Sequence, residues 1–241
     1  LKWGCAGAAI ATITAQACSG ILCFIYMWKK FPVLKLSKKD CKVKGNVTAN
    51  MLMMGVPMGL QYSVTAIGSM VMQSANNGLG SVYVSGFTAG MRIKQFAMCP
   101  FDAIATAVST FCSQNLGAGK PERIKKGLRD GIITGVLYGL FAGTILILFG
   151  GILSRMFISA DETEVLAASA KYLFCLGFFY WALGILNVCR MTVQGIGYPG
   201  RAILSGVVEM VARIATSKIF VPLYGFTAIC FADQSAWVSA V

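Results

Sequence analysis

The chain has 241 residues, of which 56% are hydrophobic and only 12% are charged, and its mean hydropathy is +0.70. Soluble domains carry about 25% charged residues, so this composition argues against an ordinary water-soluble enzyme or binding module and predicts a membrane protein. The net charge of +12 does not indicate a nucleic-acid partner, because the basic residues stand in short segments between apolar stretches.

Long apolar segments predict an all-α fold, a polytopic bundle of transmembrane helices. A helix needs about 20 residues to cross the core of a bilayer. We expect such helices at residues 4–28, 50–72, 84–116, 131–156, 165–190, 202–221 and from about 225 onward, the last of them incomplete at Val241.

The charged segments between these helices predict their orientation. Segments 29–44 and 120–129 are rich in Lys and Arg, Arg190 and Arg201 flank a third connection, and segment 159–164 carries three acidic residues. Because Lys and Arg are enriched in loops on the cytoplasmic side, we expect the basic loops 29–44 and 120–129 to be cytoplasmic and the acidic loop to face outward. This pattern is typical of a multi-pass protein of the plasma membrane.

Metal and enzyme patterns are missing from the sequence. There are nine cysteines but no Cys-x-x-Cys pair, and there is no histidine. Cysteine among apolar neighbours usually packs as a small hydrophobic residue, and no phosphate-binding loop or nucleophile triad is found. We therefore predict no metal site, no cofactor and no enzymatic activity; an intramembrane enzyme is the alternative from another functional class.

Ionisable side chains inside the predicted helices are the first functional candidates, because each costs about 2.5–3.5 kcal/mol on membrane-insertion scales. Asp102 has no basic residue within one helical turn, so it is the leading candidate for binding a proton or cation; the structural alternative is a residue near water in a cavity wall. Glu209 and Arg213 stand four residues apart on one helix face, where they either neutralise each other or take part in ion coupling. Asp233 lies in the incomplete last helix.

Polar and basic positions complete the candidate set. Gln61 of the second predicted helix, and Gln73 and Asn76 just after its end, either line an aqueous cavity or form hydrogen bonds between helices. Lys94 follows Arg92, and we expect both near the outer end of the third helix.

Four segments resemble the multidrug and toxic compound extrusion family. The segment from Ser109 to Gly119, followed by Glu122-Arg123-Ile124, resembles the signature that ends the family's eighth helix, and the matching residues are Gln114, Asn115, Gly117, Ala118 and Arg123. Further segments resemble, in chain order, the starts of the sixth and seventh helices and the passage from the tenth to the eleventh: residues 7–12, residues 55–61, and residues 194–197 with Glu209 and Arg213.

This resemblance covers essentially the whole chain and implies its organisation. Residues 1–30 would be the last helix of the first lobe, residues 31–48 a basic cytoplasmic linker, and residues 49–241 helices seven to twelve of the second lobe, with helix twelve incomplete. The expected partners are membrane lipid and the first-lobe helices that are missing here, so we do not expect the chain to transport on its own.

The resemblance also implies a function, the export of organic cations or other drugs in exchange for protons or sodium ions. Some relatives carry coupling acids in the seventh and tenth helices, but residues 50–72 and 172–189 contain no Asp or Glu, and Lys94 stands where many relatives have a carboxylate. The driving ion therefore stays open. A flippase for lipid-linked saccharides or peptidoglycan precursors is the alternative within transport; it would need a strongly basic cavity.

Overall fold

The structure is a computed structural model that describes residues 4–31, 45–159 and 161–241. All regular elements in these residues are helices, which confirms the all-α prediction. The chain divides into two units, residues 1–50 and residues 51–241. Most of the predicted basic linker 31–48 falls outside the described residues, so its cytoplasmic position stays a prediction.

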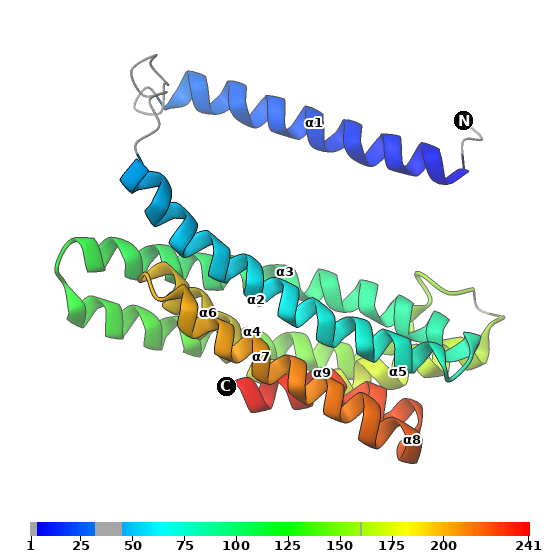
Figure 1. Cartoon of the computed structure of the whole chain (residues 1–241). Coiled ribbons are helices and arrows are strands. Elements are labelled where there is room, and N and C mark those ends of the chain that lie inside the picture. The colour runs from blue at the N-terminus through cyan, green and yellow to red at the C-terminus, as the bar shows by residue number, and fades with distance from the viewer. Residues whose placement is uncertain (1–3, 32–44, 160) are drawn as a thin grey trace. The chain divides into compact units, whose positions relative to one another are not determined.

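The helices follow one another closely along the chain (Figure 1). Their bounds are α1 Gly4–Lys30, α2 Gly45–Asn77, α3 Ser81–Gly117, α4 Pro121–Ser154, α5 Thr163–Gly177, α6 Tyr180–Gly195, α7 Pro199–Ala215, a π-helical turn Thr216–Phe220, α8 Val221–Tyr224 and α9 Phe226–Ala240.

Membrane-spanning length and apolarity are met by three of the described helices: α1 over Ala9–Lys30, α3 and α4. The pair α5 and α6 meets the same limits as one bent span. Helices α2, α7 and α9 do not meet them individually, although α7 continues without interruption through the π-helical turn and α8 to Tyr224. A helix therefore stands at each of the seven predicted positions, and length and composition by themselves support up to four crossings.

The fifth predicted helix, residues 165–190, differs from the structure because it is broken. Helices α5 and α6 meet at a bend of 59°. The break follows Gly177, a residue that favours helix weakly, and the amide of Phe179 donates to the carbonyl of Leu176 at 3.1 Å in a tight turn. The predicted basic loop 120–129 also differs, since residues 121–129 form the first turns of α4, which begins at Pro121.

Glycines of α4 bring it close to the broken pair. Gly135, Gly139 and Gly143 stand one turn apart, and a methyl group added at Gly139 would lie 2.7 Å from the Cα of Trp181 on α6. Gly143 faces the backbone of Gly177 in the same manner. Small residues at this spacing let membrane helices approach until their backbones touch, so α4 packs along both α5 and α6.

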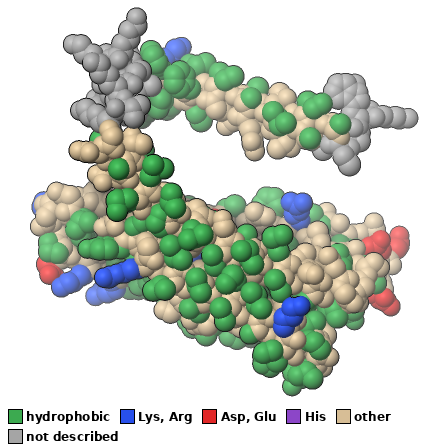
Figure 2. All heavy atoms as spheres, in the orientation of Figure 1, with side chains coloured by type: hydrophobic (Ala, Val, Ile, Leu, Met, Phe, Trp, Pro, Cys, Tyr) green, Lys and Arg blue, Asp and Glu red, His purple; other side chains and the backbone are tan. Residues whose placement is uncertain are grey.

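The opposite side of α4 is apolar and exposed. Leu137, Phe141 and Leu148 are 62%, 64% and 67% exposed, and hydrophobic side chains likewise cover much of the visible surface of residues 51–241 (Figure 2). An apolar surface of this extent is unfavourable in water, and lipid chains are the environment that suits it.

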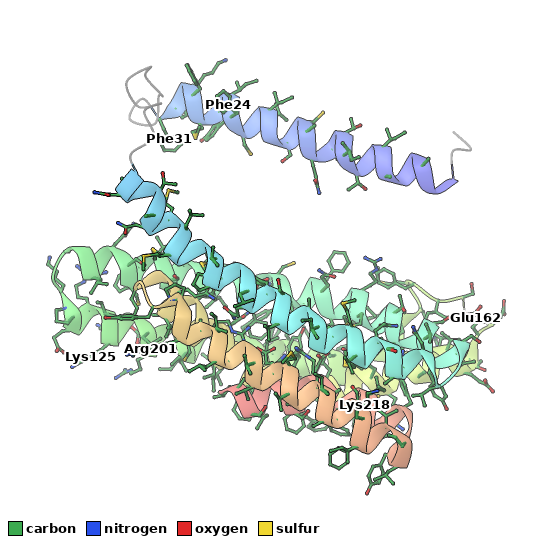
Figure 3. The ribbon with its side chains drawn as sticks, in the orientation of Figure 1. Phe24, Phe31, Lys125, Glu162, Arg201 and Lys218 are labelled. Atoms are coloured by element: carbon green, nitrogen blue, oxygen red, sulfur yellow. The ribbon has the colours of Figure 1, made fainter. Side chains whose placement is uncertain are left out.

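An exposed basic segment and an exposed acidic segment lie at opposite ends of the 51–241 unit. Lys125 and Arg201 lie at one end, and Glu162 lies at the other (Figure 3). The basic start of α4 and Arg201 near the start of α7 therefore share one end of the 51–241 unit, opposite the acidic segment; the side of the membrane that each end faces stays a prediction.

Candidate functional site

Five charged side chains from four helices meet in the interior of the 51–241 unit. They are Lys94 of α3, Arg190 of α6, Glu209 and Arg213 of α7, and Asp233 of α9. Four of them are less than 10% exposed, and the side chain of Arg190 is 15% exposed. We refer to these five residues as the charge network.

Asp233 lies at the centre of one half of this network. Its Oδ2 atom pairs with the ammonium group of Lys94 and accepts a hydrogen bond from the hydroxyl of Tyr172 at 3.0 Å. Its Oδ1 atom accepts from Nε of Arg213, also at 3.0 Å. Both oxygens are thus occupied, as the burial of a carboxylate requires.

Glu209 occupies the other half in the same way. Its Oε1 atom pairs with the guanidinium of Arg190, and its Oε2 atom lies 3.2 Å from Nη2 of Arg213. Arg190 also donates from Nε to the hydroxyl of Ser205 at 3.1 Å. Arg213 therefore bridges the two carboxylates, and the network joins α3, α6, α7 and α9.

Local sequence explains how these groups reach one another. Glu209 and Arg213 are four residues apart, so they share a helix face. Gly90 leaves room for Tyr172, because a methyl group there would lie 2.6 Å from the tyrosine ring. The ring can therefore pass α3, and its hydroxyl group reaches Asp233. The hydroxyl of Tyr180 donates to the backbone carbonyl of Lys94 at 3.1 Å, which fixes α3 against α6 at this level.

Asp102, the leading candidate from the sequence, lies apart from these contacts. It is exposed, and its Oδ1 atom accepts a hydrogen bond from the amide of Asn187 on α6 at 3.0 Å. The described residues thus place a polar amide, and no cation, at hydrogen-bonding distance from this carboxylate.

The polar candidates of α2 have different surroundings. Gln61 is buried and accepts a hydrogen bond from Gln194 of α6, whereas Gln73 donates to Asn77 one turn along its own helix at 3.1 Å. Asn76 is fully buried, and its two amide atoms have no hydrogen-bond partner among the described residues. Gln61 therefore serves contact between helices, and Asn76 is an unsatisfied polar group.

The family-motif residues build the connection from α3 to α4. Gln114, Asn115 and Gly117 form the last turn of α3, and Ala118 follows it. The carbonyl of Asn115 accepts from the amide of Lys120 at 2.9 Å, and the guanidinium of Arg123 lies 5.6 Å from the ring centre of Phe111. Ser113, which belongs to the same segment, donates to the carbonyl of Gly195 at 2.8 Å and so ties this turn to the end of α6.

Two basic residues have ion-pair partners that the sequence did not predict. Arg190 lies within α6, as the predicted helix 165–190 has it, and pairs with Glu209. Lys94 is only 7% exposed and pairs with Asp233, whereas Arg92, two residues earlier on the same helix, is exposed. Sequence reasoning named Asp233 as an acid inside an apolar segment but gave it no role, and it did not single out Tyr172, whose hydroxyl donates to this carboxylate.

Metal ligation is not indicated by this arrangement. No group of three or more His, Cys, Asp or Glu side chains comes together within residues 4–31, 45–159 and 161–241. The site is a set of mutually paired ions that holds helices together. The relative positions of these helices can change only if the ion pairs change.

Comparison with known proteins places this geometry in a family. The family model described as MatE matches residues 57–219. The probable multidrug resistance protein YpnP of Bacillus subtilis is 30% identical over 200 residues, which are 81% of this chain and 43% of that protein. The probable multidrug resistance protein NorM of Thermotoga maritima is 25% identical over 197 residues, 81% of this chain and 42% of that protein. The chain thus spans less than half the length of these relatives.

A solved structure shows the same fold. A MATE transporter crystallised in complex with MaL6 superposes with a TM-score of 0.87 at 19% identity, and the match covers 99% of this chain and 55% of that one. The fold and the family match agree along the chain. The chain belongs to the multidrug and toxic compound extrusion family and corresponds to about half of such a protein.

Proposed function

We propose that the whole protein containing this chain is a secondary active exporter of organic cations or other drugs, driven by protons or sodium ions moving the other way across the plasma membrane. The observation that carries the proposal is family membership together with relatives named as probable multidrug resistance proteins. The chain would supply the second of two lobes, and the missing first-lobe helices would supply the facing half of the cavity.

The charge network suits a lobe that moves as one body. In transporters of this class, transport works by rocking one group of helices against another around a binding site. The network joins α3, α6, α7 and α9 through buried ion pairs, and removing one partner of such a pair costs several kcal/mol. The lobe would therefore keep its internal packing while it changes orientation.

Asp102 is the residue that we propose for ion coupling in this lobe. It is an exposed carboxylate within α3 whose contact is a neutral amide, so a proton or cation can reach it without displacing a protein cation. Glu209 is held by two arginines, and we propose that it serves mainly to bind α6 to α7. A ligand shifts the equilibrium between two orientations of the lobe only if it binds one orientation more tightly than the other. Uptake of a cation at Asp102 would provide that difference in affinity.

Efflux by the full-length protein tests this proposal. Expressed in a drug-hypersensitive host, it should raise resistance to cationic drugs and export a fluorescent dye, and the export should stop when the proton and sodium gradients are dissipated. We expect Asp102→Asn to reduce efflux about tenfold or more, since a coupling group is lost. The matched control Asp130→Asn, at an exposed acid of α4, should leave efflux unchanged.

Unchanged drug susceptibility and absence of ion-dependent dye efflux would refute the proposal that the protein is an exporter. Translocation of a lipid-linked precursor by the same cells would then favour the flippase. Activity on a lipid substrate in detergent, lost on mutating Asp102 or Glu209, would favour the intramembrane enzyme.

A further inference from the structure

We propose that Lys94 is a built-in cation of this lobe: its ammonium group occupies, at Asp233, the position in which a free sodium ion or a proton would otherwise neutralise that carboxylate. The inference rests on the proposed transport function and deepens it, because it says where the driving ion does not bind. The ion would act at Asp102 or in the first lobe, and the charge network would stay ion-independent.

The pairing of the carboxylates is the first support. Glu209 and Asp233 are 2% and 1% exposed, and each contacts two protein cations. The other acids among the described residues are exposed. No buried carboxylate in this part of the chain is therefore left for an external cation.

The surroundings of the ammonium group are the second support. Besides Asp233, Nζ of Lys94 lies 3.9 Å from the sulfur of Met91 and 5.2 Å from the ring centre of Trp237. A thioether and an indole face suit an ammonium ion, which is attracted by aromatic faces. Hard metal cations instead prefer several oxygen ligands, and this position supplies oxygen chiefly from Asp233 and Tyr172.

The charge balance is the third support. Lys94, Arg190 and Arg213 bring three positive charges, and Glu209 and Asp233 bring two negative charges, so the network carries a net charge of +1. Another cation would raise this to +2 inside a membrane lobe, where repulsion between charges is poorly screened. Removal of Lys94 would give a neutral set and would leave Oδ2 of Asp233 with the hydroxyl of Tyr172 but without its cation, whose place a sodium ion or a proton could then take.

Thermal unfolding of the purified full-length protein tests the inference. The Tm of wild type, Lys94→Ala and Arg92→Ala would be measured in sodium chloride and in N-methylglucamine chloride at equal ionic strength, and at pH 5.5 and 8. Arg92 is the matched control, since it is exposed on the same helix. A ligand that binds only the folded state raises Tm, so we expect sodium or acid to raise the Tm of Lys94→Ala by about 3 °C more than that of wild type, and Arg92→Ala to respond as wild type does.

Equal responses of Lys94→Ala and wild type to both sodium and acid would overturn the inference. So would a wild-type response to sodium that disappears in Asp233→Asn. If Lys94→Ala does not fold, the double variant Lys94→Ala/Asp233→Asn is measured in its place. This variant keeps the net charge of +1 in the charge network, so it should fold and respond to ions as wild type does. Failure of the double variant to fold would overturn the inference. These readouts need no transport, so an absence of drug efflux in wild type would count against the proposed function alone.

Discussion

Asp233 and Glu122 are both acids in ion pairs, but their surroundings differ. Asp233 is buried against two cations, whereas Glu122 pairs with Lys125 at 3.3 Å with both side chains more than 70% exposed. An exposed pair contributes about 1 kcal/mol or less. A buried pair that loses one partner leaves an uncompensated charge in a low-dielectric interior, so the two acids should respond differently to substitution.

Substitution of these acids gives a prediction at the residue scale. We expect Asp233→Ala to lower the free energy of unfolding by about 3–5 kcal/mol, because Lys94 and Arg213 both lose a buried partner. Glu122→Gln should change it by about 1 kcal/mol or less. Denaturant unfolding of the full-length protein in detergent micelles measures both; equal losses for the two variants would show that the charge network does not stabilise the lobe.

The sequence could predict only part of this network. Glu209 and Arg213 are one turn apart, so their spacing predicts a shared face, and the salt bridge of 3.2 Å agrees with it. Lys94 and Asp233 are 139 positions apart, and nothing local in either segment indicates the other. Their pairing depends on how α3, α7 and α9 pack, and that packing is a tertiary property.

At the scale of elements, hydropathy located the helices well because membrane helices must be long and apolar. The predicted segment 84–116 corresponds to α3 at Ser81–Gly117. The break between α5 and α6 was missed, since residues 165–190 contain no proline and have the length of one crossing. Gly177 is a weak local signal, and the bend itself depends on close packing against α4.

The glycines of α4 give a prediction at this scale. Gly139→Ala places a methyl group 2.7 Å from the Cα of Trp181 and 2.9 Å from the carbonyl oxygen of Tyr180, and backbone atoms cannot move away cheaply. We expect a loss of about 1–3 kcal/mol by overpacking. Gly151→Ala on the same helix meets only the side chain of Ala170 at 4.0 Å and should be neutral or stabilising, because alanine favours helix over glycine.

Thermal unfolding of both variants measures this difference. A Gly139→Ala protein with the same Tm as Gly151→Ala would show that α4 does not approach α6 as closely as described.

At the scale of the whole molecule, the proposed exporter requires a lobe that crosses the bilayer with its basic segments on one side. Lys125 and Arg201 lie at one end of the 51–241 unit and Glu162 at the other (Figure 3). Because Lys and Arg are enriched on the cytoplasmic side of membrane proteins, we expect the first end to face the cytoplasm. The sequence could predict this alternation because it follows from the order of charges along the chain, without knowledge of packing.

Cysteine labelling in intact cells tests this arrangement most directly. In a full-length protein whose native cysteines are replaced, single cysteines at Lys38, Lys125 and Glu162 would be probed with a membrane-impermeant maleimide. We expect the reagent to reach Glu162→Cys from outside, and to reach Lys38→Cys and Lys125→Cys only after the cells are opened. Labelling of Lys38→Cys and Lys125→Cys from opposite sides of the membrane would contradict the proposed membrane topology of the lobe, and with it the proposal that the protein is an exporter.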